Sequence, residues 1–219
     1  MQAVVFDLDA VLINTEPIHI DTAQRLFRRL GIDLPLDQHY QFVGTSPLRM
    51  WRVLKERYSL SQNIEYLVRI EMEEQLRALE RAVDLQPTAG IVDLLEAITS
   101  RAVDVALASS STQAIVQLLL NRLGLERYFK VVVGGDSIKE GKPAPDIYLH
   151  TARLLQTSPR HCIAIEDSRN GVASAKAAGI VCVGYDNPSS GAQDLTSADL
   201  VVPDFSPGSR ARILAMLKQ

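Results

Sequence analysis

Short apolar runs alternate with helical patterns through most of this chain of 219 residues. The runs are rich in β-branched residues, and they end at turns or polar clusters, so they are typical of buried parallel strands. They predict one strand that begins at residue 4 and further strands at 103–108, 131–133, 162–165, 181–184 and 200–202. Helical periodicity lies between them, at 91–98, 115–123, 145–155, 172–178 and 211–217. This alternation predicts an α/β fold, a doubly wound parallel sheet.

Residues 15–85 interrupt the alternation, because they show helical periodicity and no convincing strand. Thr15 is expected to cap the first helix of this region, and Gly31 to end it. The predicted apolar faces are Ile20, Ala23, Phe27 and Leu30; Trp51, Leu54 and Tyr58; and Ile64, Val68, Met72, Leu76, Leu79 and Val83. We predict that residues 15–85 form a helical cap domain inserted into a core made of residues 1–14 and 86–219.

Composition excludes several classes of protein. Hydrophobic residues make up 47% of the chain, enough for a sizeable core. A net charge of -3 argues against a nucleic-acid partner, and no apolar stretch approaches the ~20 residues of a membrane span. The first residues do not resemble a signal peptide, so we expect a cytoplasmic protein, and nothing requires more than a monomer. Cys162 and Cys182 lie in apolar runs and are expected to be buried free thiols.

Polar side chains follow the predicted strands. In an open parallel sheet, ligands bind outside the carboxyl ends of the strands, so these side chains should meet at one edge. Carboxylates there can hold a divalent cation, while a hydroxyl and an ammonium group can bind phosphate. Together they predict a phosphoryl-transfer site. The side chains are Asp7 and Asp9, then Ser109, then Lys142, then Glu166 and Asp167.

The same residues carry a family resemblance. Asp7-Leu8-Asp9-Ala10-Val11 resembles the first motif of the haloacid dehalogenase superfamily, Asp-x-Asp-Gly-Val/Thr. Ser109, Lys142 and Glu166-Asp167-Ser168 match its second, third and fourth motifs in order. Residues 7–17 and 141–148 resemble the branch of β-phosphoglucomutases and sugar phosphatases. The resemblance implies a core of this superfamily with a mobile helical cap.

Roles for the acidic residues follow from position and from the resemblance. Asp7 is the candidate nucleophile, which would form an aspartyl-phosphate. Asp9 is the candidate acid and base, which would protonate the leaving oxygen and then deprotonate the attacking water. Asp7, Glu166, Asp167 and the backbone carbonyl of Asp9 would hold Mg²⁺. The alternative for Glu166 and Asp167 is a purely local role at the start of the next helix.

Further residues are candidates for binding the substrate. Ser109, with the backbone NH of Ser110, would bind phosphoryl oxygens. The alternative for Ser109 is a cap of the helix that begins near Thr112, and both roles can hold at once. Lys142 would balance the charges of Asp7 and the phosphate; the alternative is an ordinary surface lysine.

The resemblance also implies contacts from the cap. Thr15 and His19 are candidates for contacts with the substrate, because His19 lies one helical turn after Thr15, where β-phosphoglucomutases carry a histidine. The alternative for His19 is an ordinary half-exposed helix histidine. Gly44, Thr45 and Ser46 resemble the cap loop that faces the site. Two positions depart from the family pattern near the first motif, because Ala10 replaces a glycine and Asn14 replaces an aspartate.

Three departures argue against a mutase. Pro47 stands where mutases have an arginine, with Arg49 two positions later, and Thr112-Gln113 replaces Lys-Asn. An ungapped alignment places Glu71 at the position of the cap lysine. We therefore predict a Mg²⁺-dependent phosphatase for a small phosphorylated metabolite such as a sugar phosphate, with a β-phosphoglucomutase as the alternative.

Other classes fit less well. Haloacid dehalogenases lack the acid at the position of Asp9, and phosphonoacetaldehyde hydrolases need a cap lysine, for which Lys55 is the only candidate. A non-catalytic phosphate switch of the receiver type would carry its phosphorylated Asp on the third strand, where no Asp directly follows Val133.

Overall fold

The computed structural model describes residues 2–217 and contains one fully parallel sheet. Its strands lie in the order β3-β2-β1-β4-β5-β6. The strands are β1 (Ala3–Phe6), β2 (Asp104–Ala108), β3 (Val131–Val133), β4 (Cys162–Glu166), β5 (Val181–Tyr185) and β6 (Leu200–Val202). The predicted α/β fold class is confirmed, and each predicted strand is present with its ends shifted by no more than a residue.

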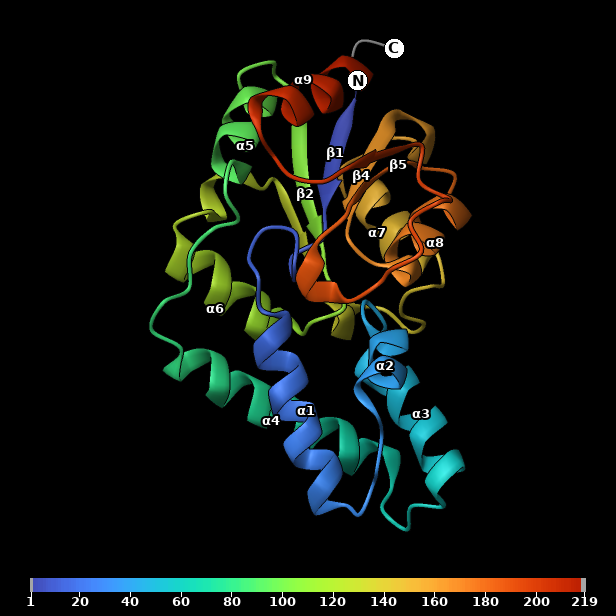
Figure 1. The fold of residues 1–219 in the computed structure, drawn as a ribbon. Coiled ribbons are helices and arrows are strands. Elements are labelled where there is room, and N and C mark those ends of the chain that lie inside the picture. The colour runs from blue at the N-terminus through green and yellow to red at the C-terminus, as the bar shows by residue number, and fades with distance from the viewer. Residues whose placement is uncertain (1, 218–219) are drawn as a thin grey trace.

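Helices cover both faces of the sheet (Figure 1). Val4 and Phe6 of β1 face a hydrophobic cluster with α5, α6 and α9, whereas Ala3 and Val5 face a second cluster with α7 and α8. Alternate residues of a strand point to opposite faces, so β1 is buried on both sides. The α-helices of the core are α5 (Ile91–Thr99), α6 (Gln113–Leu123), α7 (Asp146–Leu154), α8 (Arg169–Ala177) and α9 (Pro207–Met216). The 3-10 helices of the core are η2 (Glu126–Tyr128), η3 (Gly135–Ser137), η4 (Pro159–His161) and η5 (Pro188–Ser190).

A helical cap lies beyond the carboxyl ends of the strands (Figure 1). It has its own hydrophobic cluster, in which Phe27 of α1 meets Trp51 of α3 edge to face, with ring centroids 5.6 Å apart. No strand is found among its residues, as the sequence predicts. The helices are α1 (Glu16–Arg29), α2 (Leu36–His39), α3 (Pro47–Tyr58) and α4 (Ile64–Arg81), with the 3-10 helix η1 (Tyr40–Phe42).

The predicted apolar face of α4 is partly wrong. Its fully buried residues are Leu67, Glu71, Gln75 and Leu79, of which only Leu79 belongs to the predicted stripe. Ile64, Val68 and Leu76 of that stripe are partly buried against the hydrophobic clusters. Val83 lies beyond the end of the helix and is 84% exposed. The reason is that α4 packs against α1 and α3 of the cap and also against α6 of the core, so polar residues face inward on this helix.

The two chain segments that join cap and core lie side by side. Ile13 bridges to Pro87, and the amide of Thr88 donates to the carbonyl of Leu12 at 2.8 Å. Both segments therefore enter the cap at one place, directly after β1.

The topology places the end of β1 at the centre of the sheet. The chain runs from β1 to β2 and β3 on one side, and then crosses to β4 on the other. Such a reversal of strand order opens a crevice at the carboxyl ends of the strands, where ligands bind in α/β folds. Cys162 and Cys182 are buried free thiols, as predicted. None of the helices within residues 2–217 is long and apolar enough to cross a membrane.

Candidate active site

Asp7 follows β1 directly, and a buried lysine holds it. The amide of Asp7 donates to the carbonyl of Ile165, so the ladder between β1 and β4 fixes its backbone. Lys142 Nζ donates to Asp7 Oδ1 at 2.6 Å and to the carbonyl of Ala108 at 3.0 Å. Lys142 is only 1% exposed, which excludes a surface lysine.

The acidic pair from β4 lies beside Asp7. Lys142 Nζ is 2.6 Å from Glu166 Oε1, which also accepts a hydrogen bond from the Tyr148 hydroxyl. Asp167 Oδ2 accepts a hydrogen bond from Ser190 at 2.5 Å. Carboxylate oxygens of Asp7, Glu166 and Asp167 lie within 4.8 Å of one another.

These acids fit a divalent cation. All three are buried, and Glu166 Oε2 has no hydrogen-bond partner. Burial raises the pKa of Asp7 to about 8 although Lys142 opposes the shift, and burial together with the other two carboxylates raises that of Asp167. Crowded, desolvated carboxylates with a free oxygen are a suitable donor set for a hard cation such as Mg²⁺. The alternative helix-capping role falls to Ser168, whose hydroxyl accepts from the amide of Gly171.

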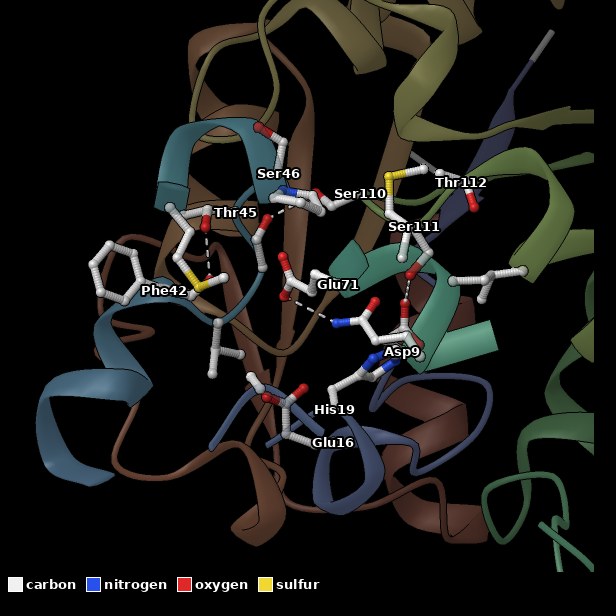
Figure 2. Close-up of a pocket in the computed structure, with 18 of the residues that line it drawn as sticks. Asp9, Glu16, His19, Phe42, Thr45, Ser46, Glu71, Ser110, Ser111 and Thr112 are labelled. Carbon is white, nitrogen blue, oxygen red and sulfur yellow. Dashed lines mark hydrogen bonds and ion pairs between the residues drawn. The ribbon is translucent and has the colours of Figure 1, made fainter. Parts of the chain in front are cut away.

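Asp9 is held by side chains from both cap and core. Its Oδ1 accepts from the Thr15 hydroxyl at 2.5 Å and lies 2.8 Å from His19 Nε2. Its Oδ2 accepts from Ser111 at 2.7 Å and, more weakly, from Ser109 at 3.4 Å. Figure 2 shows the contact of Ser111 with Asp9 and the ring of His19 beside it. Thr15, His19 and Ser109 were candidates from the sequence, and the structure brings them together around Asp9.

The contact with His19 changes both pKa values. Burial disfavours the charged form of Asp9, but the charge and hydrogen bond of His19 outweigh it and hold the pKa of Asp9 well below its usual range. Burial likewise opposes the charge on His19, yet Asp9 raises the pKa of His19 to about 9. The two side chains therefore form an ion pair at neutral pH.

Thr15 occupies the predicted N-cap position of α1, but its side chain does not cap the helix. Thr15 occupies the N-cap position with helical backbone angles, φ -95° and ψ -9°, and its side chain makes no capping bond. A capping side chain needs extended backbone angles to reach the first free amides of the helix, and here the hydroxyl turns to Asp9 instead.

Ala10 adopts the backbone conformation that glycine favours, with φ 60°. Its amide donates to the carbonyl of Ile13 at 2.7 Å, and its carbonyl accepts from Asn187 at 2.8 Å. These bonds hold the turn after β1 in spite of the alanine side chain. Asn14 donates to the hydroxyl of Ser189, a contact between the chain crossing and η5.

The serines after β2 have different partners. Ser109 is fully buried, and its hydroxyl accepts from the amide of Ser111, while Thr112 occupies the N-cap position of α6. The alternative that Ser109 caps α6 is therefore wrong, because Ser109 lies too far before the helix. The Ser110 hydroxyl donates to the carbonyl of Gly44 at 2.8 Å, which ties the cap loop to the core.

The predicted cap loop closes over this edge of the sheet. A side chain on Gly44, which has φ +76°, would collide with Ser168, so only a glycine allows the loop to approach so closely. Ser46 caps α3. Gly44, Thr45 and Ser46 all line a cavity of about 100 Å³ between cap and core.

This cavity contains Asp7, Asp9 and Asp167 and residues that the sequence did not single out as site residues (Figure 2). Ser111 was detectable, because it belongs to the run of serines after β2. Several of the others lie on cap helices whose rotation about their axes the sequence pattern did not fix. Among them are Glu16, His39, Glu71, Met72 and Gln75.

The ion pair of His19 and Asp9 predicts a pH-dependent stability. Protonated His19 stabilises the folded state below its unfolded pKa of 6.5, and this contribution is lost as the pH rises through about 9. We expect His19→Gln to lower the free energy of unfolding by about 1–3 kcal/mol near pH 6 and by much less above pH 10. Urea denaturation at both pH values measures this difference. His161→Gln, at an exposed position, is the control; an equal effect of His19→Gln at both pH values would contradict the prediction.

Comparison with known families identifies the class of this fold and site. Residues 4–185 match the family model described as haloacid dehalogenase-like hydrolase. The chain belongs to this family, and it is an enzyme of the haloacid dehalogenase-like hydrolase type.

Individual relatives fall among phosphatases and phosphomutases. The chain is 35% identical over 180 residues to a phosphorylated carbohydrates phosphatase of Thermotoga maritima, covering 82% of each protein. It is 31% identical over 213 residues to a β-phosphoglucomutase of Bacillus subtilis, covering 94% of this chain and 91% of the relative. Its fold is similar to the crystal structure of a β-phosphoglucomutase from Clostridium difficile, with a TM-score of 0.86, 25% identity and coverage of 100% and 97%.

Proposed function

We propose that the protein is a Mg²⁺-dependent phosphatase that hydrolyses a small sugar phosphate through an aspartyl-phosphate on Asp7. The arrangement of Asp7 carries the proposal. A buried lysine contacts one of its oxygens, two further acids lie beside it, and the carboxylate lines the cavity between cap and core. Two relatives are named as a phosphorylated carbohydrates phosphatase and a β-phosphoglucomutase, and these names agree with the proposal.

The reaction would proceed in two displacements. Asp7 attacks phosphorus as the bond to the sugar oxygen breaks, and Asp9 gives a proton to that oxygen. A water molecule then attacks the phosphorus of the aspartyl-phosphate, Asp9 takes its proton, and the bond to Asp7 breaks. Inorganic phosphate leaves, and both carboxylates return to their starting states.

The ion pair with His19 sets a condition for the first step. Asp9 in its present contacts is a carboxylate with a lowered pKa, so it must leave His19 and take up a proton before it can give one to the substrate oxygen. Thr15 and His19 belong to the cap, which we define as residues 15–85. A movement of the cap about residues 10–15 and 85–90 would release Asp9 and admit the substrate.

Several groups would act on the phosphate. Asp7, Glu166, Asp167 and the backbone carbonyl of Asp9 would hold Mg²⁺, which would offset the repulsion between Asp7 and the phosphoryl oxygens. Ser109 and the amide of Ser110 would bind those oxygens. Lys142 would favour the ionised form of Asp7 and orient it for attack.

The cavity favours a phosphatase over a mutase. A mutase has to retain a bisphosphate between two transfers, which requires cationic contacts for the second phosphate. Glu71, an acid, lines this cavity. Arg49, which could have replaced the missing arginine, lines a neighbouring cavity instead, and Gln113 accepts a hydrogen bond from the amide of Gly134.

The second candidate function is a β-phosphoglucomutase with altered cap contacts. The similarity to the B. subtilis and C. difficile mutases over nearly the whole chain favours it. Conversion of β-glucose 1-phosphate to glucose 6-phosphate that depends on a bisphosphate primer would support the mutase over the phosphatase.

Phosphate release from a panel of sugar phosphates with Mg²⁺ tests the proposal. We expect release by the wild-type protein and a loss of about 10²–10⁴-fold in kcat for Asp9→Asn, because the leaving oxygen then lacks its acid. Asp37→Asn, at an exposed position of the cap, should not change the rate. A wild-type protein that releases phosphate from none of the sugar phosphates would refute the phosphatase.

A further inference from the structure

The charged groups of the cavity are mostly acidic. Beside Asp7, Asp9 and Asp167, which the proposed reaction uses, the cap contributes Glu16 and Glu71. The only cationic or potentially cationic side chains that line it within the described chain are histidines, His19 and His39. His19 is paired with Asp9, and burial lowers the pKa of His39 to about 4, so His39 is neutral at physiological pH.

The other cationic side chains near the cavity either pair with carboxylates or line a different cavity. Lys142 is enclosed by Asp7 and Glu166, behind the reacting carboxylate. Arg49, Arg52 and Lys139 line the neighbouring cavity between α3 and the loop of residues 139–141. The part of the cavity that would receive the group attached to the phosphate therefore has carboxylates and no free positive charge.

Glu71 is held rigidly in this wall. Its Oε2 accepts from the indole nitrogen of Trp51 at 2.6 Å, and its Oε1 accepts from Gln75 at 3.1 Å. Trp51 is fully buried in the cap cluster against Phe27, and Glu71 itself is 3% exposed. Figure 2 shows the carboxylate of Glu71 in the wall of the cavity. Each oxygen keeps a lone pair for a further donor.

Hydroxyl groups form part of the remaining wall, beside apolar side chains such as Phe42, Val43 and Met50. Thr45, Ser46, Ser110 and Thr112 line the cavity together with the amide of Gln75. Neutral donors and acceptors of this kind suit a polyhydroxylated ligand, whereas a fixed carboxylate accepts from its hydroxyls. Glu16, buried in the first turn of α1, adds a second acceptor.

We propose that Glu71, assisted by Glu16, selects neutral polyhydroxylated monophosphates and rejects substrates that carry a second anionic group. The proposal rests on the phosphatase function given above and names its substrate class. Glu71 is a specificity residue and takes no part in the transfer itself. A second phosphate or a carboxylate would lie in a partly desolvated site against fixed negative charges, where repulsion is stronger than in water.

The test compares phosphate release from four substrates of similar size. They are a neutral hexose monophosphate, a hexose bisphosphate, a phosphorylated sugar acid and an amino sugar phosphate. Assays at about pH 8 keep both acids ionised, because burial raises the pKa of each to about 7. We expect kcat/KM for the neutral monophosphate to exceed that for the two substrates with a second anionic group by at least about tenfold.

Glu71→Gln tests the residue. The amide oxygen can still accept from Trp51, so the cap cluster is kept while the negative charge is lost. We expect the discrimination against the bisphosphate and the sugar acid to fall by at least about tenfold, with most of the change in KM. Glu73→Gln is the matched control, because Glu73 lies on the same helix, is 43% exposed and pairs with Arg69 and Arg77 away from the cavity.

The outcomes separate the two proposals. Phosphate release from none of the four substrates would refute the phosphatase. Release from the bisphosphate or the sugar acid at rates equal to the neutral substrate would overturn the role of Glu71 alone. Unchanged discrimination in Glu71→Gln, or a tenfold preference of the wild-type protein for the amino sugar phosphate, would also overturn it.

Discussion

Asp7→Asn is expected to lower kcat for phosphate release by about 10⁴-fold or more, because the substitution removes the nucleophile and leaves no other acid within the same geometry. Asp9 cannot replace it, since both of its oxygens are engaged by Thr15, His19, Ser109 and Ser111. The measurement is phosphate release under saturating substrate and Mg²⁺, with single-turnover experiments to detect a residual slow transfer.

The same variant should remain folded. Asp7 lies within 4.8 Å of Glu166 and Asp167, so removing its charge relieves repulsion among buried carboxylates, while Lys142 keeps its contact with Glu166. We expect Asp7→Asn to melt at or above the temperature of the wild-type protein without metal, and to lose the rise in Tm that Mg²⁺ gives the wild type.

Asp104→Asn is the matched control for Asp7→Asn. Asp104 begins β2 at the opposite end of the sheet and pairs with Lys130 near the surface. Its substitution should leave both the rate and the response to Mg²⁺ unchanged. Substantial phosphate release by Asp7→Asn, with a preserved response to Mg²⁺, would contradict the role of Asp7.

The residues that follow strands could be predicted because the topology of a parallel sheet determines their positions. Once the alternation of strands and helices is recognised, Asp7, Ser109 and Glu166 must lie at the same edge, whatever the details of packing. Lys142 lies in a loop after β3, so the strand pattern indicated the edge of the sheet that it reaches, and the family resemblance supported its role beside Asp7. The structure shows this contact at 2.6 Å.

The cap residues could not be predicted in the same way. Helical periodicity separates buried from exposed faces only when the buried face is apolar, and α4 buries Glu71 and Gln75 beside Leu67 and Leu79. A pattern based on hydrophobicity therefore predicts the wrong orientation of this helix about its axis. The sequence indicated Glu71 only through the position it shares with a lysine in related mutases. Its partner Trp51 was predicted to pack in a hydrophobic core.

Thr15 illustrates a second limit. A threonine before a helix is a common cap, and the sequence alone cannot show that a carboxylate six residues earlier competes for its hydroxyl. The competing partner exists because the turn at Ala10 brings the following chain back, so that the start of α1 lies beside Asp9. The local rule failed at a residue of the candidate site, because the hydroxyl of Thr15 binds a carboxylate of the site and not an amide of the helix.

Lys142→Met is expected to destabilise the protein by about 3–5 kcal/mol, because it leaves the buried carboxylates of Asp7 and Glu166 without their counter-ion. The loss should be small near pH 5 and increase as the pH rises through about 8, since burial raises the pKa of Asp7 to about 8 and protonation below that pH removes its charge. Urea denaturation without metal measures it.

The double variant Lys142→Met/Glu166→Gln should recover part of the stability, because it removes one of the unpaired charges. Lys176→Met breaks the partly exposed pair with Asp199 and should cost less than about 1 kcal/mol. An equally small cost for Lys142→Met would mean that the acids are neutral in the folded protein, and Asp7 would then be unable to attack phosphate without first losing a proton.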